Sequence, residues 1–401
     1  MKKETFYQSS QALALLAFAL LIGAFFRTAG LNNAKLVYCD EFRTVIPYSW
    51  ESPLVNIVYS IPLYFFGNNN DVALFTTAFL ALVNIYLVFV IGKSLFNAKV
   101  GSYAALVVSL TSTHIRYSRS GFSCILQSLM MLLAFWCLFL CYPENEREYR
   151  YTLLCGLFLG SAFTVYIPSY AAIAVIISLF LYIQIRKKKS LKEILLQLAI
   201  LGASSIAVIF LVDVYYRTFA GSYFFRLFHY GKRSASFALP GISLFSVIGK
   251  GITDDGGLIQ SGLLAGGFIY CLIEYIIKKE RNTFLLVGFI FFSYLLYTLM
   301  GFRFHSVRIR HFVYLISFLA LAAGYLLSRI EEINKFAVIG LLVVFLFLSL
   351  QKSYAITTQT FKTTLISDWI KQNNIKKNKI MSLLNIYERG IIRKQSVFPE
   401  E

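Results

Sequence analysis

Two adjacent carboxylates, Asp40 and Glu41, lie in a polar segment that follows the first apolar run of the chain. A carboxylate at a membrane surface can act as a general base, taking a proton from a hydroxyl or amine that attacks an electrophilic carbon. Most acidic pairs in loops are simply solvated, so the pair indicates catalysis only with support from other residues. Which of the two carboxylates would be the base is open at this point.

Basic residues supply that support in two short segments, "THIRYSRSGF" (113–122) and "GFRFHSVRIRHF" (301–312). Their arginines and histidines are His114, Arg116, Arg119, Arg303, His305, Arg308, Arg310 and His311. A guanidinium fork matches the oxygens of a phosphate and can stabilise a departing phosphate. The alternative is that these side chains only reach lipid headgroups.

Composition places these residues in a membrane protein. The chain has 401 residues, of which 58% are hydrophobic and only 14% charged, whereas a soluble domain averages about 45–50% apolar and about 25% charged. The net charge of +18 is explained by basic loops between apolar runs, so no nucleic-acid partner is expected. The fold class is therefore an all-α polytopic protein in a lipid bilayer.

About eleven transmembrane helices are expected from the apolar runs. The first is interpreted as a retained span and not as a cleaved signal peptide. Pro168 divides the long run 152–184 into two helices. The expected spans are residues 10–26, 72–92, 100–113, 122–141, 152–166, 168–184, 194–212, 258–277, 283–301, 312–328 and 336–350.

The distribution of basic residues predicts the orientation. With the N-terminus inside and eleven spans, the runs "RKKKSLK" (186–192) and "KKER" (278–281) face the cytoplasm, as the positive-inside rule requires. The long loops 27–71 and 213–257 then lie outside, together with the acidic pair and both basic clusters. A surface helix is expected over residues 55–67 of the first outer loop.

This layout predicts three parts. An N-terminal catalytic transmembrane module covers residues 1–212 and includes outer loop 27–71. A C-terminal transmembrane module covers 213–350 and includes outer loop 213–257, and a short extracytoplasmic tail covers 351–401 with a short helix near 365–373.

Four stretches resemble the integral-membrane C-type glycosyltransferases, within the branch of protein O-mannosyltransferases and lipid A aminoarabinose transferases. They are "DEFR" with the segment from Glu51 to Val108, "IRYSRSGFSCILQSLMMLLAF" (115–135), "GLFLGSAFTVYIPSYAAIAV" (156–175) and, more faintly, "RIRHFVYLISFLALAAG" (308–324). The likeness covers about residues 1–185 in order. The likeness rests on the order and spacing of the four stretches, because no single motif is unique.

The resemblance implies a glycosyltransferase with a polyprenyl-phosphate-linked sugar donor, an unknown extracytoplasmic acceptor and an active site on the outer face. It implies that Asp40 is the base, that Glu41 orients it or contacts substrate, and that Arg116, Arg119 and, more weakly, Arg308 and Arg310 bind the donor phosphate. Further candidates for substrate contact are Tyr38, Arg43, Glu51, His114, His305 and His311. The implied location is the plasma membrane of a bacterium.

The chain departs from this branch in two places. Ser52-Pro53-Leu54 stands where the aminoarabinose branch tends to have Lys-Pro-Pro, and no lysine lies near Tyr166. Specificity for aminoarabinose or mannose is therefore not implied.

No cofactor is indicated by the residue spacing. A divalent metal stays open, but "TDDGG" (253–257) is not a DxD motif and is typical of a turn. The six cysteines form no CxxC pair. Four of them lie in or beside apolar runs and are interpreted as small hydrophobic residues: Cys137, Cys141, Cys155 and Cys271.

Two other functions remain open. A transporter or flippase of lipid-linked saccharides would place ionisable residues or broken helices near the membrane centre. An O-antigen-type polymerase or ligase would use a large late outer loop rich in arginine and histidine, and loop 213–257 contains both residue types.

Overall fold

The structure, a computed structural model, describes residues 6–29, 31, 53–67, 70–120, 123–142, 147–165, 169–220, 244–304 and 312–358. Within these ranges the chain is helical and contains no strand. The helices are α1 (Phe6–Thr28), α3 (Pro53–Phe66), α4 (Asn70–Leu95), α5 (Ala98–Leu110), α6 (Ser112–Ser118), α7 (Cys124–Leu140), α8 (Glu148–Val165), α9 (Tyr170–Arg186), α10 (Leu191–Ala220), α12 (Leu244–Lys278), α13 (Arg281–Phe304), α14 (Val313–Ile333) and α15 (Lys335–Thr358).

The predicted class is confirmed: the chain is an all-α integral membrane protein. Ten of the eleven expected spans each coincide with one helix, whereas the expected span 100–113 crosses the break between α5 and α6 at Thr111. The helix α3 covers the expected surface helix. Six helices in the described ranges are long and apolar enough to cross a membrane alone, and several shorter helices are also apolar. The number of crossings and the orientation therefore stay predictions.

Helices α10 and α15 continue beyond the apolar runs that predicted them. The helix α10 extends to Ala220, into the predicted second outer loop, whereas the predicted start of the next span at 258 coincides with the break at Gly257 that divides α12. The last helix continues to Thr358, inside the predicted tail. The expected turn at 253–257 lies within α12, which departs from helical geometry only at Gly257, where φ is 71°.

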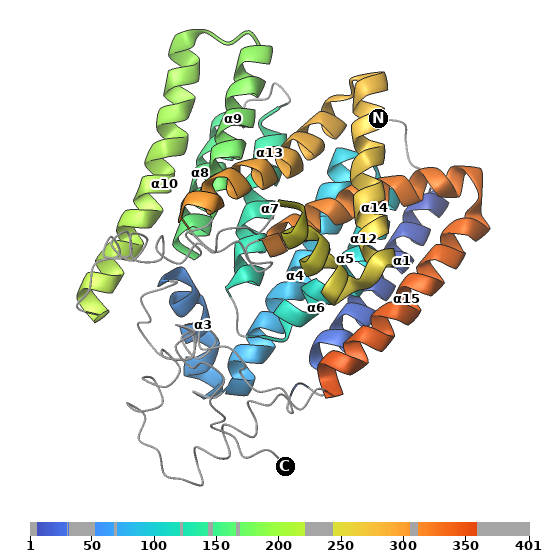
Figure 1. Ribbon diagram of the computed structural model, residues 1–401. Coiled ribbons are helices and arrows are strands. Elements are labelled where there is room, and N and C mark those ends of the chain that lie inside the picture. The colour runs from blue at the N-terminus through green and yellow to red at the C-terminus, as the bar shows by residue number, and fades with distance from the viewer. Residues whose placement is uncertain are drawn as a thin grey trace, which may run out of the picture.

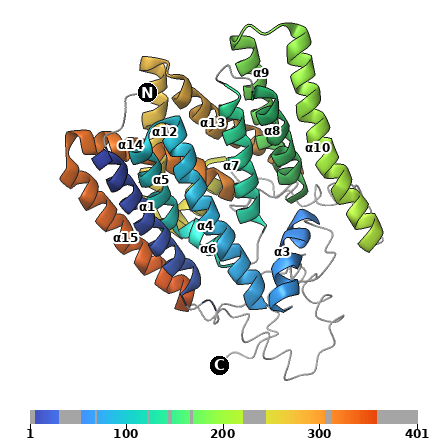
Figure 2. The same ribbon diagram turned by 180° about the vertical axis from the view of Figure 1, so that it is seen from behind.

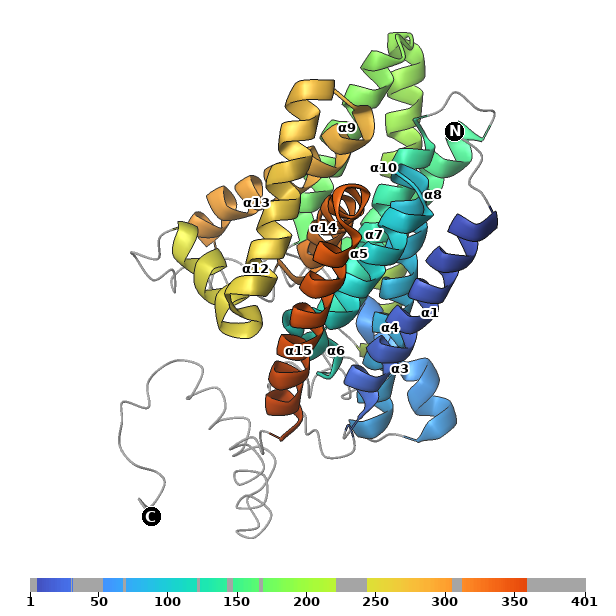
Figure 3. The ribbon, with the colours of Figure 1, turned by 90° about the vertical axis from the view of Figure 1, so that its right-hand side faces the viewer.

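Successive long helices run up and down in one bundle (Figure 1). We call the end that carries α6 and α3 the α6 end, and the end that carries the α9–α10 turn the opposite end. The pair α8 and α10 stands at one side, as the view from behind also shows (Figure 2). The helices α12 and α15 both pass beside α6 (Figure 3).

The helix α5 lies at the centre of the bundle, packed against α1, α4 and α14. Every residue of α5 except Lys99 is buried. Small residues permit this close packing, since a Cβ on Gly101 would meet the α4 backbone and a Cβ on Gly324 would meet the α5 backbone at Ala104. With only 13 residues, α5 is about 20 Å long, so α6 is needed to continue its course.

Glycines also set the contact between α8 and α10. A Cβ on Gly160 would meet the carbonyl oxygen of Ser205, and one on Gly156 would meet Ser204 and Leu201. Ser205 Oγ donates a hydrogen bond of 2.8 Å to the carbonyl of Gly156. The two backbones therefore touch where glycine leaves space, as in other membrane helix pairs.

We expect Gly160→Ala to lower the free energy of unfolding by about 1–3 kcal/mol, because the added methyl overpacks the contact. Gly202→Ala on α10 is the matched control, since a Cβ there would meet nothing within 4 Å, and alanine favours a helix by about 0.5–1 kcal/mol over glycine. Thermal unfolding in detergent measures both changes. Equal midpoints for the two variants would contradict this account of the α8–α10 contact.

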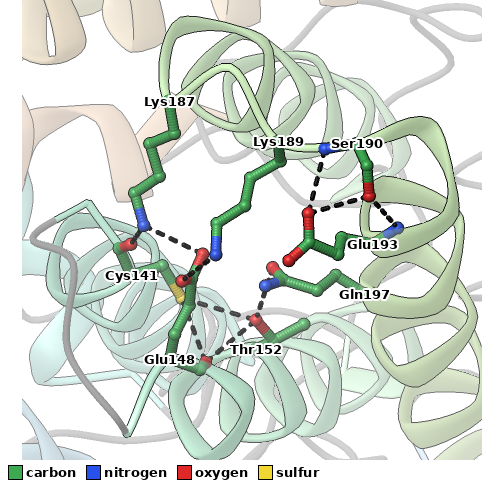
Figure 4. Close-up of polar contacts among 8 residues, drawn as sticks. All are labelled: Cys141, Glu148, Thr152, Lys187, Lys189, Ser190, Glu193 and Gln197. Atoms are coloured by element: carbon green, nitrogen blue, oxygen red, sulfur yellow. Dashed lines mark hydrogen bonds and ion pairs between the residues drawn. The ribbon is translucent and has the colours of Figure 1, made fainter.

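A charged cluster joins the α7–α8 and α9–α10 turns at the opposite end (Figure 4). Lys187 Nζ lies 2.9 Å from Glu148 Oε1, and both side chains are only 5% exposed. Lys189 Nζ lies 3.4 Å from Glu148 Oε2, and Lys187 also donates to the carbonyl of Cys141. The cluster fastens the turns far from the candidate site.

Glu148 makes stability depend on pH. Burial opposes its ionisation, but hydrogen bonds from Lys187, Gln197 and Gln184, together with the charge of Lys187, outweigh burial and hold the pKa of Glu148 below its ordinary value of 4.5. Because the pKa is lowered on folding, the stabilisation is present above about pH 4.5 and is lost as the pH falls through the folded pKa. The unfolding midpoint should fall across this acid range in the wild type and fall less in Glu148→Gln. Parallel curves would contradict the role of this carboxylate.

Candidate functional site

The helix break between α5 and α6 is the base of the candidate site. Thr111 takes an extended conformation, with ψ at 117°, so the regular backbone hydrogen bonding of α5 ends there. The last carbonyls of a helix lack intrahelical partners and must be satisfied from elsewhere. The carbonyl of Val108 keeps a 3.3 Å hydrogen bond from the Thr111 amide, whereas the carbonyls of Ser109 and Leu110 need donors from other helices.

Two of these partners come from helices late in the chain. Gln260 of α12 donates through Nε2 to the carbonyl of Leu110, and its Oε1 accepts from the amide of Ser112 at the start of α6. Ser349 of α15 donates to the same Leu110 carbonyl at 2.6 Å and accepts from Gln260 Nε2. Gln260 and Ser349 are fully buried, so these bonds stabilise the break without competition from water.

Arg27, at the end of α1, supplies the donor for the Ser109 carbonyl and a second donor for that of Val108. Its Nη1 donates to the carbonyls of Ser109 and Gly23, and its Nη2 donates to the carbonyl of Val108. The side chain is fully buried. Arg27 therefore ties α1 to the break with four hydrogen bonds, the fourth of which goes to His114.

His114 is held in one tautomer by Arg27. The Arg27 Nη2 atom lies 2.8 Å from His114 Nδ1, and an arginine can only donate, so Nδ1 accepts and Nε2 carries the proton. Burial and then the charge of Arg27 lower the pKa of His114 well below its ordinary value. His114 is thus neutral near pH 7, and its buried Nε2–H has no partner.

Arg119, at the C-terminal end of α6, makes a second contact between α6 and α1. Its Nη1 donates to the carbonyl of Phe26 at 3.0 Å and to that of Ala29 at 2.8 Å. These carbonyls form the negative end of the α1 dipole, where a cation is favourable. Arg27 and Arg119 therefore fasten α1 and α6 reciprocally.

The structure thus brings together three of the predicted site residues, His114, Arg116 and Arg119, at the α6 end. Arg116 is half-buried on α6. The other nine predicted residues lie outside the described residues: Tyr38, Asp40, Glu41, Arg43, Glu51, His305, Arg308, Arg310 and His311.

Arg27 and Gln260 were missed by sequence reasoning. Arg27 directly follows the first apolar run and reads as an ordinary terminal arginine of a span. Gln260 stands near the start of an apolar run, where a single amide carries little signal. A buried arginine or glutamine at the end of a span needs a hydrogen-bond partner. That requirement is the one signal in the sequence that could have indicated these two residues.

The α6 end carries positive charge that no carboxylate among the described residues neutralises. Arg27 and Arg119 bond only to carbonyls and His114, and the ion pairs between described residues involve neither. Two guanidinium groups in this setting favour an anion nearby. In the described part of the chain, no three His, Cys, Asp or Glu residues are grouped as metal ligands.

One known protein family matches the part of the chain that contains the α5–α6 break. Residues 50–215 match the family described as dolichyl-phosphate-mannose-protein mannosyltransferase. That segment includes α5 and α6. It also includes Arg116 and Arg119 at the end of α6, which we call the arginine turn. No curated protein matches the chain significantly.

Solved structures match more of the chain. ArnT from Cupriavidus metallidurans bound to undecaprenyl phosphate has a TM-score of 0.58 and 15% identity, over 80% of this chain and 60% of ArnT. The archaeal oligosaccharyltransferase AglB from Archaeoglobus fulgidus, in complex with an inhibitory peptide and a dolichol-phosphate, has a TM-score of 0.56 and 12% identity. That match covers 88% of this chain and 56% of AglB.

The chain has the fold of the integral-membrane C-type glycosyltransferases. The resemblance predicted from the sequence is thereby confirmed. This chain spans about 60% of the length of ArnT and 56% of that of AglB. At these identities the C-type likeness establishes the fold, and activity is argued separately.

Proposed function

We propose that the protein transfers a sugar from a polyprenyl-phosphate-linked donor to an acceptor on the extracytoplasmic side of a bacterial plasma membrane. The observation that carries this proposal is the arginine turn of α6, built at one end of a fold whose ArnT and AglB examples hold polyprenyl phosphates. The family match over residues 50–215 includes this turn.

In the proposed reaction, Asp40 takes the proton from the acceptor hydroxyl or amine. The acceptor atom forms a bond to the anomeric carbon of the sugar while the bond from that carbon to the phosphate oxygen breaks. The sugar carbon is inverted, and polyprenyl phosphate leaves with the bonding electron pair. Glu41 orients the base or contacts substrate.

Positive charge supports departure of the phosphate. We assign Arg116 and Arg119 to the donor phosphate, with Arg308 and Arg310 in the same role. Arg119 uses Nη1 for two carbonyls of α1, which fixes its position and leaves its other nitrogens for a ligand. A guanidinium held in place before the reaction stabilises developing charge without reorganising.

The test is identification of bound lipid. The detergent-purified protein should carry a polyprenyl phosphate or its sugar conjugate, detected by mass spectrometry of an organic extract. It should also bind added undecaprenyl phosphate more tightly than an undecaprenyl alcohol of the same length. Equal binding of the phosphate and the alcohol would overturn the proposal.

A further inference from the structure

Two exposed arginines at the opposite end of the bundle lie against aromatic rings. Arg186 ends α9 and Arg281 begins α13, and these two helices pack against each other. Arg281 Cζ lies 4.1 Å from the centre of the ring of Tyr142, which follows α7. Arg186 Cζ lies 5.7 Å from the centre of the Tyr182 ring on α9. Neither arginine belongs to the candidate site, so their role is a separate question.

The rings join the two arginines into one surface. The centre of the Tyr182 ring lies 4.8 Å from that of Phe284, and Phe284 follows Arg281 by one turn of α13. The rings of Tyr142, Tyr182 and Phe284 are all half-buried, so each keeps an accessible part. We call these three aromatic residues, together with Arg186 and Arg281, the arginine–aromatic surface.

Each guanidinium of this surface is held by its Nε atom. Arg186 Nε donates to Tyr182 Oη at 3.1 Å, and Arg281 Nε donates to Asn282 Oδ1 at 2.9 Å. Asn282 in turn donates to the carbonyl of Leu95, at the end of α4. The Nη groups of both arginines are left for a ligand, and two Nη groups form the fork that matches phosphate oxygens.

No carboxylate among the described residues neutralises these two charges. The ion pairs between described residues involve neither Arg186 nor Arg281. Glu148, at the same end, is already bound by two lysines, and Glu280 forms no ion pair with Arg281, its neighbour in the chain. The surface therefore suits an anion from outside the described part of the chain.

Apolar side chains beside the arginines select a lipid as the source of that anion. Ile185, which precedes Arg186, is 64% exposed, and Ile276 and Ile277 at the end of α12 are 63% and 73% exposed. A lipid can place its phosphate on the arginines and its acyl chains along these isoleucines, which a soluble anion cannot use. This end is also the predicted cytoplasmic side, where anionic lipids attract basic residues near the membrane.

We propose that the arginine–aromatic surface binds the headgroup phosphate of an anionic phospholipid in the predicted cytoplasmic leaflet. Arg186 and Arg281 donate to the phosphate oxygens through their Nη groups. The hydroxyl of Tyr182 accepts from Arg186 and keeps its own proton to donate to the headgroup. A zwitterionic lipid binds more weakly, because its ammonium faces the two cations. This inference does not depend on the proposed function.

The test compares two lipids with identical acyl chains, phosphatidylglycerol and phosphatidylcholine. The full chain in detergent is titrated with each, and bound lipid is counted by native mass spectrometry. The wild type should bind phosphatidylglycerol about tenfold more tightly than phosphatidylcholine. The double variant Arg186→Gln with Arg281→Gln should bind phosphatidylglycerol at least about tenfold more weakly, since each arginine donates hydrogen bonds to a charged group. Its binding of phosphatidylcholine should not change.

The matched control removes two other exposed cations from the same end. Arg150 stands on α8 and Lys192 on α10. Arg150→Gln with Lys192→Gln should change the affinity for phosphatidylglycerol by less than about twofold, because exposed charges contribute little singly. Arg186→Lys keeps the charge but not the fork, and should weaken binding by about threefold. The thermal midpoint without lipid should be the same in every variant, so that a loss of binding does not come from unfolding.

Three results would overturn the inference. Equal losses in the two double variants would mean that net charge, not this surface, attracts the lipid. Equal affinity of the wild type for the two lipids would remove the selection for an anion. Binding of glycerol phosphate as tightly as phosphatidylglycerol would mean that the ligand is a soluble anion. Each of these results leaves the proposed sugar transfer untouched, since that rests on the α6 end.

Discussion

Asp40→Asn is expected to lower sugar transfer by about a hundred- to ten-thousandfold, the usual contribution of a general base. Asparagine has nearly the same shape but cannot take the acceptor proton. Binding of undecaprenyl phosphate should be retained, because we assign the phosphate to the arginines. Transfer is measured with radiolabelled lipid-linked sugar and the acceptor fraction of the native membrane.

The matched control is Asp71→Asn, an exposed carboxylate in the first turn of α4. Asp71 follows the segment of the chain that contains Asp40, and the Asp71→Asn protein should transfer sugar at the wild-type rate. Glu41→Gln should fall between the two, since Glu41 is assigned a supporting role. Wild-type activity in Asp40→Asn, with Glu41→Gln inactive, would exchange the two roles, and full activity in both would contradict the carboxylate mechanism.

Arg27→Met is expected to give the largest loss of stability, about 3–5 kcal/mol, because it strands buried hydrogen-bond acceptors at the α5–α6 break. Methionine fills most of the space but cannot donate to the carbonyls of Val108 and Ser109 or to His114. The measurement is the thermal unfolding midpoint of the protein in detergent, with unfolding followed by circular dichroism.

Arg186→Met serves as the control, because Arg186 is an exposed arginine at the end of α9. It should change the midpoint little. The midpoint of Arg27→Lys should lie between those of Arg27→Met and the wild type, since an ammonium can reach some of the carbonyls but not all. If Arg27→Met and Arg186→Met had equal midpoints, the hydrogen bonds of Arg27 would not stabilise the break.

The helix order could be predicted from the sequence because each membrane span is an apolar run bounded by charged or polar turns. Pro168 correctly divided the run 152–184, since α8 ends at Val165 and α9 begins at Tyr170. Helix ends were less predictable. The helix α15 continues through "QKSYAITT" (351–358) because backbone bonding carries a helix past its apolar stretch.

The arginine turn could also be anticipated, because arginines at a span end stand out against apolar neighbours. Its partners could not. Arg27 meets Ser109 across 82 residues and His114 across 87, and neither spacing leaves a periodic pattern. The tautomer of His114 likewise depends on a contact that only the fold creates.

The bonds around Leu110 also bear on the order in which the protein is made. The break receives Arg27 from the first helix, but Gln260 and Ser349 come from α12 and α15, which are synthesised much later. The Leu110 carbonyl therefore has both of these bonds only after α15 has been synthesised. A chain truncated before Ser349 would contain most of the described helices and still lack a finished α5–α6 junction, so this junction is among the last parts of the described structure to form.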